Sequence, residues 1–168
     1  MKLAGTLLAL LVLIAGCGAD PGGEAPRKEG DGTTRDAGAV ETSVEQISGG
    51  QSGPDERGVV VANSAAELAA ATGLEVPDSG EGLYVSAHAG ERPTGGYRVS
   101  LSSAGAGEIR VSLREPGPGD IVTQALTQPY AVAVVKREGS RPPKAGELRF
   151  VDAGGEPLGW PVHRAERG

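Results

Sequence analysis

The 168-residue sequence is poor in cysteine, aromatic side chains and positive charge. It has one cysteine and five aromatic residues, and its formal net charge is −6. A single cysteine excludes an internal disulfide, and an acidic chain lacks the basic surface that binds a phosphate backbone. No apolar run reaches the roughly 20 residues that span a bilayer as a helix. We therefore expect neither a nucleic-acid partner nor a permanent transmembrane helix.

The N-terminal residues have the layout of a secretory signal peptide. Lys2 is followed by an apolar run to Gly16, and Cys17 comes next. The segment Leu13–Cys17 resembles a bacterial lipobox, which implies cleavage after Gly16 and lipidation of Cys17, with palmitate among the acyl chains. An ordinary signal peptide that contains a cysteine is the alternative interpretation.

Lipidation of Cys17 would fix where the mature protein resides. Several acyl chains on one residue give stable attachment, at about 0.8 kcal/mol per buried CH₂. We expect the protein on the extracytoplasmic side of the cell membrane or the outer membrane. Modification also consumes the only thiol, so a cysteine nucleophile and a thiolate metal site are excluded.

Residues 17–56 have the composition of an acidic, disordered linker. Between residues 18 and 56 there are nine Gly, three Pro, nine Asp or Glu and three Lys or Arg. Its large aliphatic residues, Val40, Val44 and Ile47, show no sustained period, and at most one transient helical turn is expected around the last two. The linker carries a charge of −6 and residues 57–168 carry −1. We place the folded domain at 57–168.

Period-2 alternation separated by Gly, Pro and Asp predicts a mainly β domain, a small antiparallel sandwich or barrel. Residues 97–102 and 109–114 read as a hairpin, and the apolar run 130–135 reads as a strand covered on both faces. Further strands are expected at 59–61, 83–88, 148–151 and 157–160, and 121–126 is a shorter strand or a loop.

One short helix interrupts the predicted strands. Ser64 and Glu67 have the spacing of a capping box, and Gly73 is placed to end the helix after about two turns. The residues between them are good helix formers.

Two elements of the predicted domain resemble the C-terminal domain family of PrcB, a subunit of a surface protease complex. The family pattern G-x-[KR]-x-T-G-G-Y-x-[VI] is similar to Gly90–Val99, and T-x-P-Y-x-[VI] is similar to Thr127–Val132. Pro116–Gly119 supplies the Pro-Gly element between them. The resemblance implies a secreted or lipid-anchored domain associated with proteases, and it implies no catalytic mechanism.

The motif residues are our candidate partner-binding site, with a structural role as the alternative. Gly-Gly permits positive φ in a turn, and the two tyrosines are expected to enter the core at strand starts and to pack together. The candidate residues are Arg92, Pro93, Thr94, Gly95, Gly96, Tyr97, Thr127, Pro129 and Tyr130.

The first of these elements also has a looser resemblance to chagasin-like inhibitors of cysteine proteases. These are immunoglobulin-type sandwiches whose inhibitory loop reads N-P-T-T-G-[YF]. Here Arg92–Tyr97 lacks the Asn and the second Thr of that pattern. Direct inhibition through the loop 92–97 is therefore the alternative to a regulatory binding module.

No residue pattern predicts catalysis, a metal or a cofactor. His88 or His163 could act as a general base and Ser86 or Ser100 as a nucleophile, but no G-x-S-x-G elbow surrounds either serine. No H-x-x-x-H, C-x-x-C or D-x-D-x-D-G spacing occurs. We expect a non-enzymatic protein that acts by binding an exported partner, a protease among the candidates.

Overall fold

The structure is a computed structural model that describes residues 42–137 and 143–165. The predicted signal peptide, Cys17 and the first part of the predicted linker lie outside the described residues. The described residues belong to one compact unit of the chain. Within them, the single α-helix is too short to cross a membrane.

In the described part of the chain, eight strands form two separate sheets, so the predicted mainly β fold is confirmed as a sandwich rather than a closed barrel. The larger sheet has the order β1-β6-β3-β2-β8, with β1 at Thr42–Gly50, β6 at Tyr130–Arg137, β3 at Leu83–Ala89, β2 at Arg57–Ala62 and β8 at Val162–Arg164. The smaller sheet has the order β4-β5-β7, with β4 at Arg98–Gly105, β5 at Glu108–Arg114 and β7 at Arg149–Val151.

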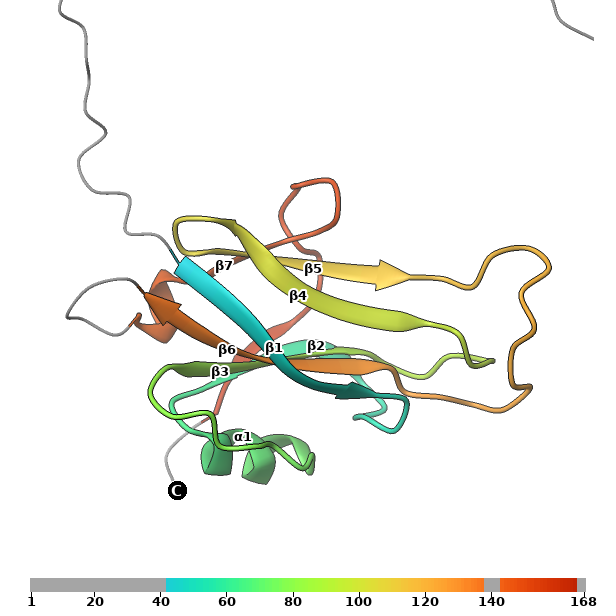
Figure 1. Cartoon of the computed structure of the whole chain (residues 1–168), viewed down its shortest axis with the longest axis horizontal. Helices are drawn as coiled ribbons and strands as arrows, with labels where there is room; N and C mark the ends of the chain where they lie inside the picture. The colour runs from blue at the N-terminus through green and yellow to red at the C-terminus, as the bar shows by residue number, and fades with distance from the viewer. Residues whose placement is uncertain (1–41, 138–142, 166–168) are drawn as a thin grey trace, which may run out of the picture. The chain divides into compact units, whose positions relative to one another are not determined.

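The two sheets and helix α1 (Ala65–Thr72) form three layers, with the larger sheet in the middle (Figure 1). Alternate residues of β3 and β6 face the smaller sheet, and their neighbours face the helix. One core cluster fills the space between the sheets and includes Val85, Ala133 and Ile109. A second cluster, with Leu68 and Val134, lies on the helix side. The continuous apolar run in β6 follows from burial on both faces.

Helix α1 begins and ends where the sequence predicts. The Ser64 side chain accepts a hydrogen bond from the Glu67 backbone N–H at 3.1 Å. Gly73 adopts a left-handed φ of 71°, and its N–H donates to the Ala69 carbonyl. Both contacts satisfy backbone groups that the helix ends leave unpaired.

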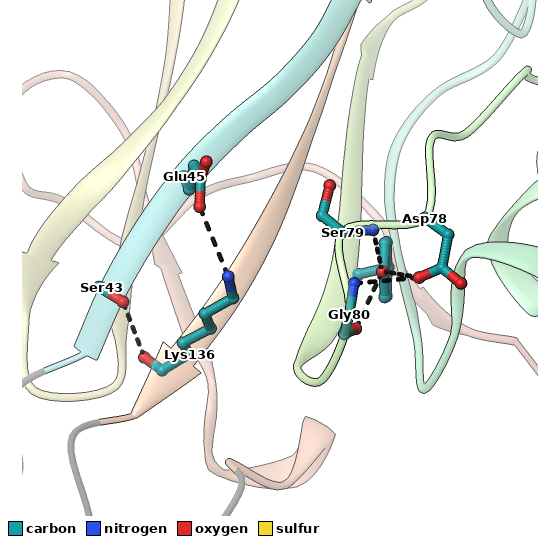
Figure 2. A network of polar contacts seen from close by, with 7 residues as sticks. Ser43, Glu45, Asp78, Ser79, Gly80 and Lys136 are labelled. Atoms are coloured by element: carbon teal, nitrogen blue, oxygen red, sulfur yellow. Dashed lines mark hydrogen bonds and ion pairs between the residues drawn. The ribbon is translucent and has the colours of Figure 1, made fainter.

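A buried tyrosine, Tyr84, makes hydrogen bonds with the turn that precedes β3. The Tyr84 hydroxyl accepts from the Ser79 N–H at 2.8 Å and lies 2.9 Å from Asp78 Oδ1 and 3.0 Å from the Gly80 carbonyl. Asp78, Ser79 and Gly80 converge on this point in Figure 2. The hydrogen bonds from Gly80 N–H and from Tyr84 hold the pKa of the Asp78 carboxyl below its usual value.

The prediction that residues 42–56 belong to a disordered linker is wrong, because Thr42–Gly50 form the edge strand β1. This strand pairs antiparallel with β6, and Lys136 of β6 contacts Ser43 and Glu45 (Figure 2). The pairing register shifts between Gln46 and Ser48, which marks a β-bulge. Val44 packs on the cluster between the sheets and Ile47 on the helix-side cluster. Residues an odd number of positions apart point to opposite faces of a strand, so these two aliphatic residues do not repeat on one face and a period-2 test for one apolar face does not detect the strand.

Strand β1 also closes one side of the sandwich against the smaller sheet. The buried Thr42 hydroxyl accepts from the Gly107 N–H at 2.9 Å, and the Thr42 carbonyl accepts from Ser103 Oγ at 2.8 Å. Gln46 Oε1 accepts from the Leu101 N–H of β4 at 3.2 Å. These bonds satisfy backbone donors at the edge of the smaller sheet.

We expect Thr42→Val to lower the free energy of unfolding by about 1–3 kcal/mol, because the isosteric side chain leaves the buried Gly107 N–H unpaired. Urea unfolding of the full chain measures the change. Ser43→Ala is the matched control, since its exposed hydroxyl makes only a 3.5 Å contact and its loss is expected to be neutral. Equal values for the two variants would contradict this role of Thr42.

The C-terminal part departs from the predicted hairpin. Residue 157 forms one bridge with Val151, and the Leu158 N–H donates to the Phe150 carbonyl, but no second strand follows there. The chain instead crosses to the larger sheet, where β8 pairs parallel to β2. A cleft of about 970 Å³ lies at this side, between β7 and β8. The sandwich is therefore closed along β1 and β4 and open along β7 and β8.

Candidate functional site

Three connections gather at one end of the sandwich, and we call this surface the loop end. They are residues 51–56 between β1 and β2, residues 90–97 between β3 and β4, and residues 115–129 between β5 and β6 (Figure 1). The last two contain the sequence motifs from which the candidate site was predicted. The predicted short strand or loop at 121–126 is part of the 115–129 loop.

The two motif loops are hydrogen-bonded to each other. Arg92 and Thr127 exchange backbone hydrogen bonds, at 2.7 Å from the Arg92 N–H and 3.0 Å from the Thr127 N–H. The Gly95 N–H donates to the Thr123 carbonyl at 2.9 Å. Thr127 Oγ1 donates to the Thr94 carbonyl at 2.8 Å. Elements some 30 residues apart in the sequence thus form one unit.

The third loop completes the unit. The Gly53 N–H donates to the Gln128 carbonyl and the Gln128 N–H donates to the Gln51 carbonyl, both at 2.8 Å. The Gln51 side chain donates to the Tyr97 carbonyl at 2.8 Å. The loop end therefore includes residues 51–56, which the sequence assigned to the linker.

Tyr97 does not enter the core as predicted. Its ring is half-buried, and the Arg92 guanidinium carbon lies 5.6 Å from the ring centroid. This distance is within the range of a cation–π interaction, which holds the loop against the start of β4. Arg92 Nε is buried and has no hydrogen-bond partner among the described residues.

Tyr130 packs partly on the helix-side cluster, which agrees with a buried anchor at the start of β6. Its ring lies against two glycines of the first loop region: a Cβ at Gly50 would lie 2.9 Å from Tyr130 Cε1, and one at Gly53 would lie 2.9 Å from Tyr130 Cβ. The glycines that gave residues 17–56 the composition of a linker here make room for an aromatic ring. No spacing rule in the sequence connects them with it.

Of the two adjacent glycines in the motif, Gly96 has a φ of 89°, in the left-handed region, and Gly95 does not have positive φ. A Cβ at Gly96 would lie 2.7 Å from Val122 Cγ1 and 3.1 Å from Pro116 Cβ. The two motif loops are therefore in close contact at Gly96. The predicted positive φ is confirmed for this residue alone.

Gly96→Ala is expected to destabilise the protein by about 2 kcal/mol, because left-handed strain adds to the clash with Val122. Gly119→Ala is the matched control: Gly119 also has positive φ, 95°, but a Cβ there meets nothing within 4 Å. It should cost about 1 kcal/mol. Thermal unfolding of the full chains measures both values, and a larger effect at residue 119 would contradict close packing of the loops.

The loop end exposes apolar side chains in the 115–129 loop. Ile121 is fully exposed and Leu126 is 62% exposed. Exposed apolar side chains are candidates for contact with another protein. Neither residue belongs to the motifs from which the site was predicted.

The serine and histidine considered for catalysis lie together but inside the protein. Ser86 Oγ is 2.9 Å from His88 Nε2, on the helix-facing side of β3, and their exposed fractions are 0% and 3%. Burial lowers the pKa of His88 to about 4. A histidine with this pKa is a weak base at neutral pH, and the serine is closed to a substrate. The pair can satisfy polar groups in the core.

His163 is exposed on β8 and lines, together with His88, a depression of about 350 Å³ beside β2. Ser100 is exposed on the outer face of the smaller sheet. In the described part of the chain, no three His, Cys, Asp or Glu side chains are grouped so as to hold a metal ion.

Fold and site together define a small β-sandwich domain with a candidate binding surface made of loops. Within it, residues 83–136 match the family model described as PrcB C-terminal. The predicted resemblance to this family is confirmed for that segment, about a third of the chain. The match supports a relation to protease-complex subunits. No curated protein and no solved structure matches the chain.

The matched segment runs from β3 to the end of β6. It contains two adjacent strands of the larger sheet, the β4–β5 hairpin of the smaller sheet and both motif loops. Strands β1 and β2, helix α1 and strands β7 and β8 lie outside it.

Proposed function

We propose that the protein is a membrane-anchored extracytoplasmic binding module that holds or regulates a secreted protease or another exported partner. The observation that carries the proposal is the junction of the two motif loops, joined through Arg92 and Thr127 into one surface. The family match supports a protease-related partner. The lipobox at Cys17 supports the anchor.

The loop end is suited to binding because its backbone is already ordered. Hydrogen bonds join all three loops, so little conformational entropy is lost when a partner docks. Exposed Ile121 and Leu126 supply apolar area at the same place. Burial of such side chains supplies most of the favourable free energy in protein association.

Crosslinking of the full chain in native membranes tests the proposal. We expect Ile121→Asp with Leu126→Asp to abolish recovery of the partner that the unaltered chain retains. Val162→Asp is the control, because Val162 is 48% exposed on the edge strand β8 and lines a different depression from Ile121. Loss of the same partner from both variants, or from neither, would refute the loop end as the binding surface.

A different assay distinguishes direct protease inhibition by the loop 92–97 from the proposed binding function. Backbone hydrogen bonds join this loop to residues 123–127. This arrangement favours contact over a broad surface rather than insertion of a single free loop. Secreted proteases titrated with the full chain should keep their activity if the module only holds or regulates a complex. Stoichiometric inhibition that Pro93→Ala relieves would support the inhibitor instead.

Anchoring is tested independently at Cys17. We expect the unaltered chain to incorporate labelled palmitate and to fractionate with membranes, and Cys17→Ser to lose both properties. Wild-type protein that carries no palmitate label and is recovered in the cytosol would refute the anchor. That result would not bear on the loop end.

A further inference from the structure

Two arginines face each other on the outer surface of the smaller sheet, next to the loop end. Arg98 of β4 and Arg114 of β5 are directly opposite in the antiparallel register, and both are exposed. Their neighbours in the chain, Val99 and Leu113, pack on the core between the sheets, so the two guanidinium groups share the outer face. We call Arg98 and Arg114 the arginine pair.

Like charges in opposite positions of a β ladder are destabilising. Within the described residues the arginine pair takes part in no ion pair: the ion pairs there join Lys136 to Glu45 and Arg137 to Glu147. The outer face around the pair offers hydroxyl groups, with Ser100 and Ser112 as the next opposed residues. No carboxylate of the described residues therefore lies within ion-pair distance of either guanidinium group.

The arginine pair lines two depressions. The larger, about 460 Å³, is also lined by Ser100, Tyr130 and residues of β1, and no acidic residue borders it. The smaller, about 280 Å³, includes Ile121 and Asp120. Asp120 Oδ2 already accepts a hydrogen bond from the Gly117 N–H at 2.8 Å. Glu115 follows Arg114 in the sequence but lines neither depression.

We propose that the arginine pair is the docking site for an acidic segment of the protein partner, with its carboxylates on Arg98 and Arg114 and an apolar side chain on Ile121. This inference rests on the proposed function and names the chemistry of the partner. Guanidinium groups bind carboxylates through two parallel hydrogen bonds, which gives both strength and orientation. Ile121 lines the same depression as the pair, so charge and apolar contact adjoin.

A peptide titration tests the site directly. The probe is a fluorescent hexapeptide of alternating glutamate and leucine, added to the full chain in detergent micelles, and its counterpart has glutamine for glutamate. We expect the acidic probe to bind, and Arg98→Gln with Arg114→Gln to weaken it by about tenfold or more. Arg149→Gln is the matched control, an exposed arginine of β7 in the same sheet, and should change binding less than about twofold.

Folding of the double variant is checked by its thermal midpoint. Removal of two opposed like charges should leave the midpoint unchanged or raise it, so that lost binding cannot be assigned to unfolding. Equal binding of the glutamine probe would overturn the proposal. So would binding that Arg149→Gln weakens as much as the double variant.

Two further outcomes separate this inference from its competitors. Vesicles of anionic phosphatidylglycerol that bind through the arginine pair, with no binding of the acidic probe, would overturn the proposal in favour of a lipid surface. If the crosslinked partner is lost in the Ile121 and Leu126 variant but kept in the arginine double variant, the docking inference fails and the proposed function stands.

Discussion

Deletion of Thr42–Gly50 is expected to abolish cooperative unfolding of the domain. The deletion removes β1, the antiparallel partner of β6 along that strand's full length. It would expose the β6 backbone edge and remove the contacts that Val44 and Ile47 make with the two core clusters. It would also leave the Gly107 N–H without its hydrogen-bond acceptor. An exposed apolar edge also invites aggregation.

The measurement is urea unfolding followed by far-UV circular dichroism on the full chain. A deletion of equal length, residues 24–32 of the predicted linker, is the control and is expected to keep the wild-type midpoint. A cooperative transition that survives loss of Thr42–Gly50 would show that the domain starts after β1, as the composition alone predicts.

Acidification from pH 7 to pH 4 is expected to reduce the free energy of unfolding by roughly 3 kcal/mol through His88 alone. Folded His88 has a pKa of about 4, and the unfolded residue has the ordinary value of 6.5. Above pH 6.5 both states are neutral and the contribution is constant. Between pH 6.5 and 4 only the unfolded state binds the proton, so stability falls by about 1.4 kcal/mol per pH unit.

Urea unfolding of the full chain across this range measures the slope. His88→Gln is expected to flatten the pH dependence between pH 6.5 and 5, where carboxylates contribute little. A slope that is the same in wild type and in His88→Gln would contradict burial of a neutral imidazole beside Ser86.

Local patterns in the sequence were sufficient for the elements that follow one simple rule. The β4–β5 hairpin alternates strictly, β6 is apolar throughout, and Ser64 with Gly73 marks the helix ends. In each case the signal lies within one element and needs no knowledge of its neighbours. The same is true of the two motif loops, whose residues pointed to a turn before a strand.

The missed features depend on distant partners. The large aliphatic residues of β1, Val44 and Ile47, face opposite sides of the sheet, and Gly50 lies against the ring of Tyr130, 80 residues away. Strand β8 has three exposed residues and exists through its pairing with β2. The junction between Arg92 and Thr127 and the opposition of Arg98 and Arg114 follow from sheet register, which a single sequence does not specify.

The order of strands in the larger sheet determines when the domain can assemble. Thr42 pairs with Arg137 and Gly50 with Tyr130, so the first strand synthesised finds its neighbour only after the sixth has been made. Such distant pairing makes folding slow, because the entropy cost of closing a long loop comes before the stabilising contacts form. The larger sheet therefore stays incomplete until β6 has been made, and an incomplete domain can still pass through a narrow channel as an extended chain.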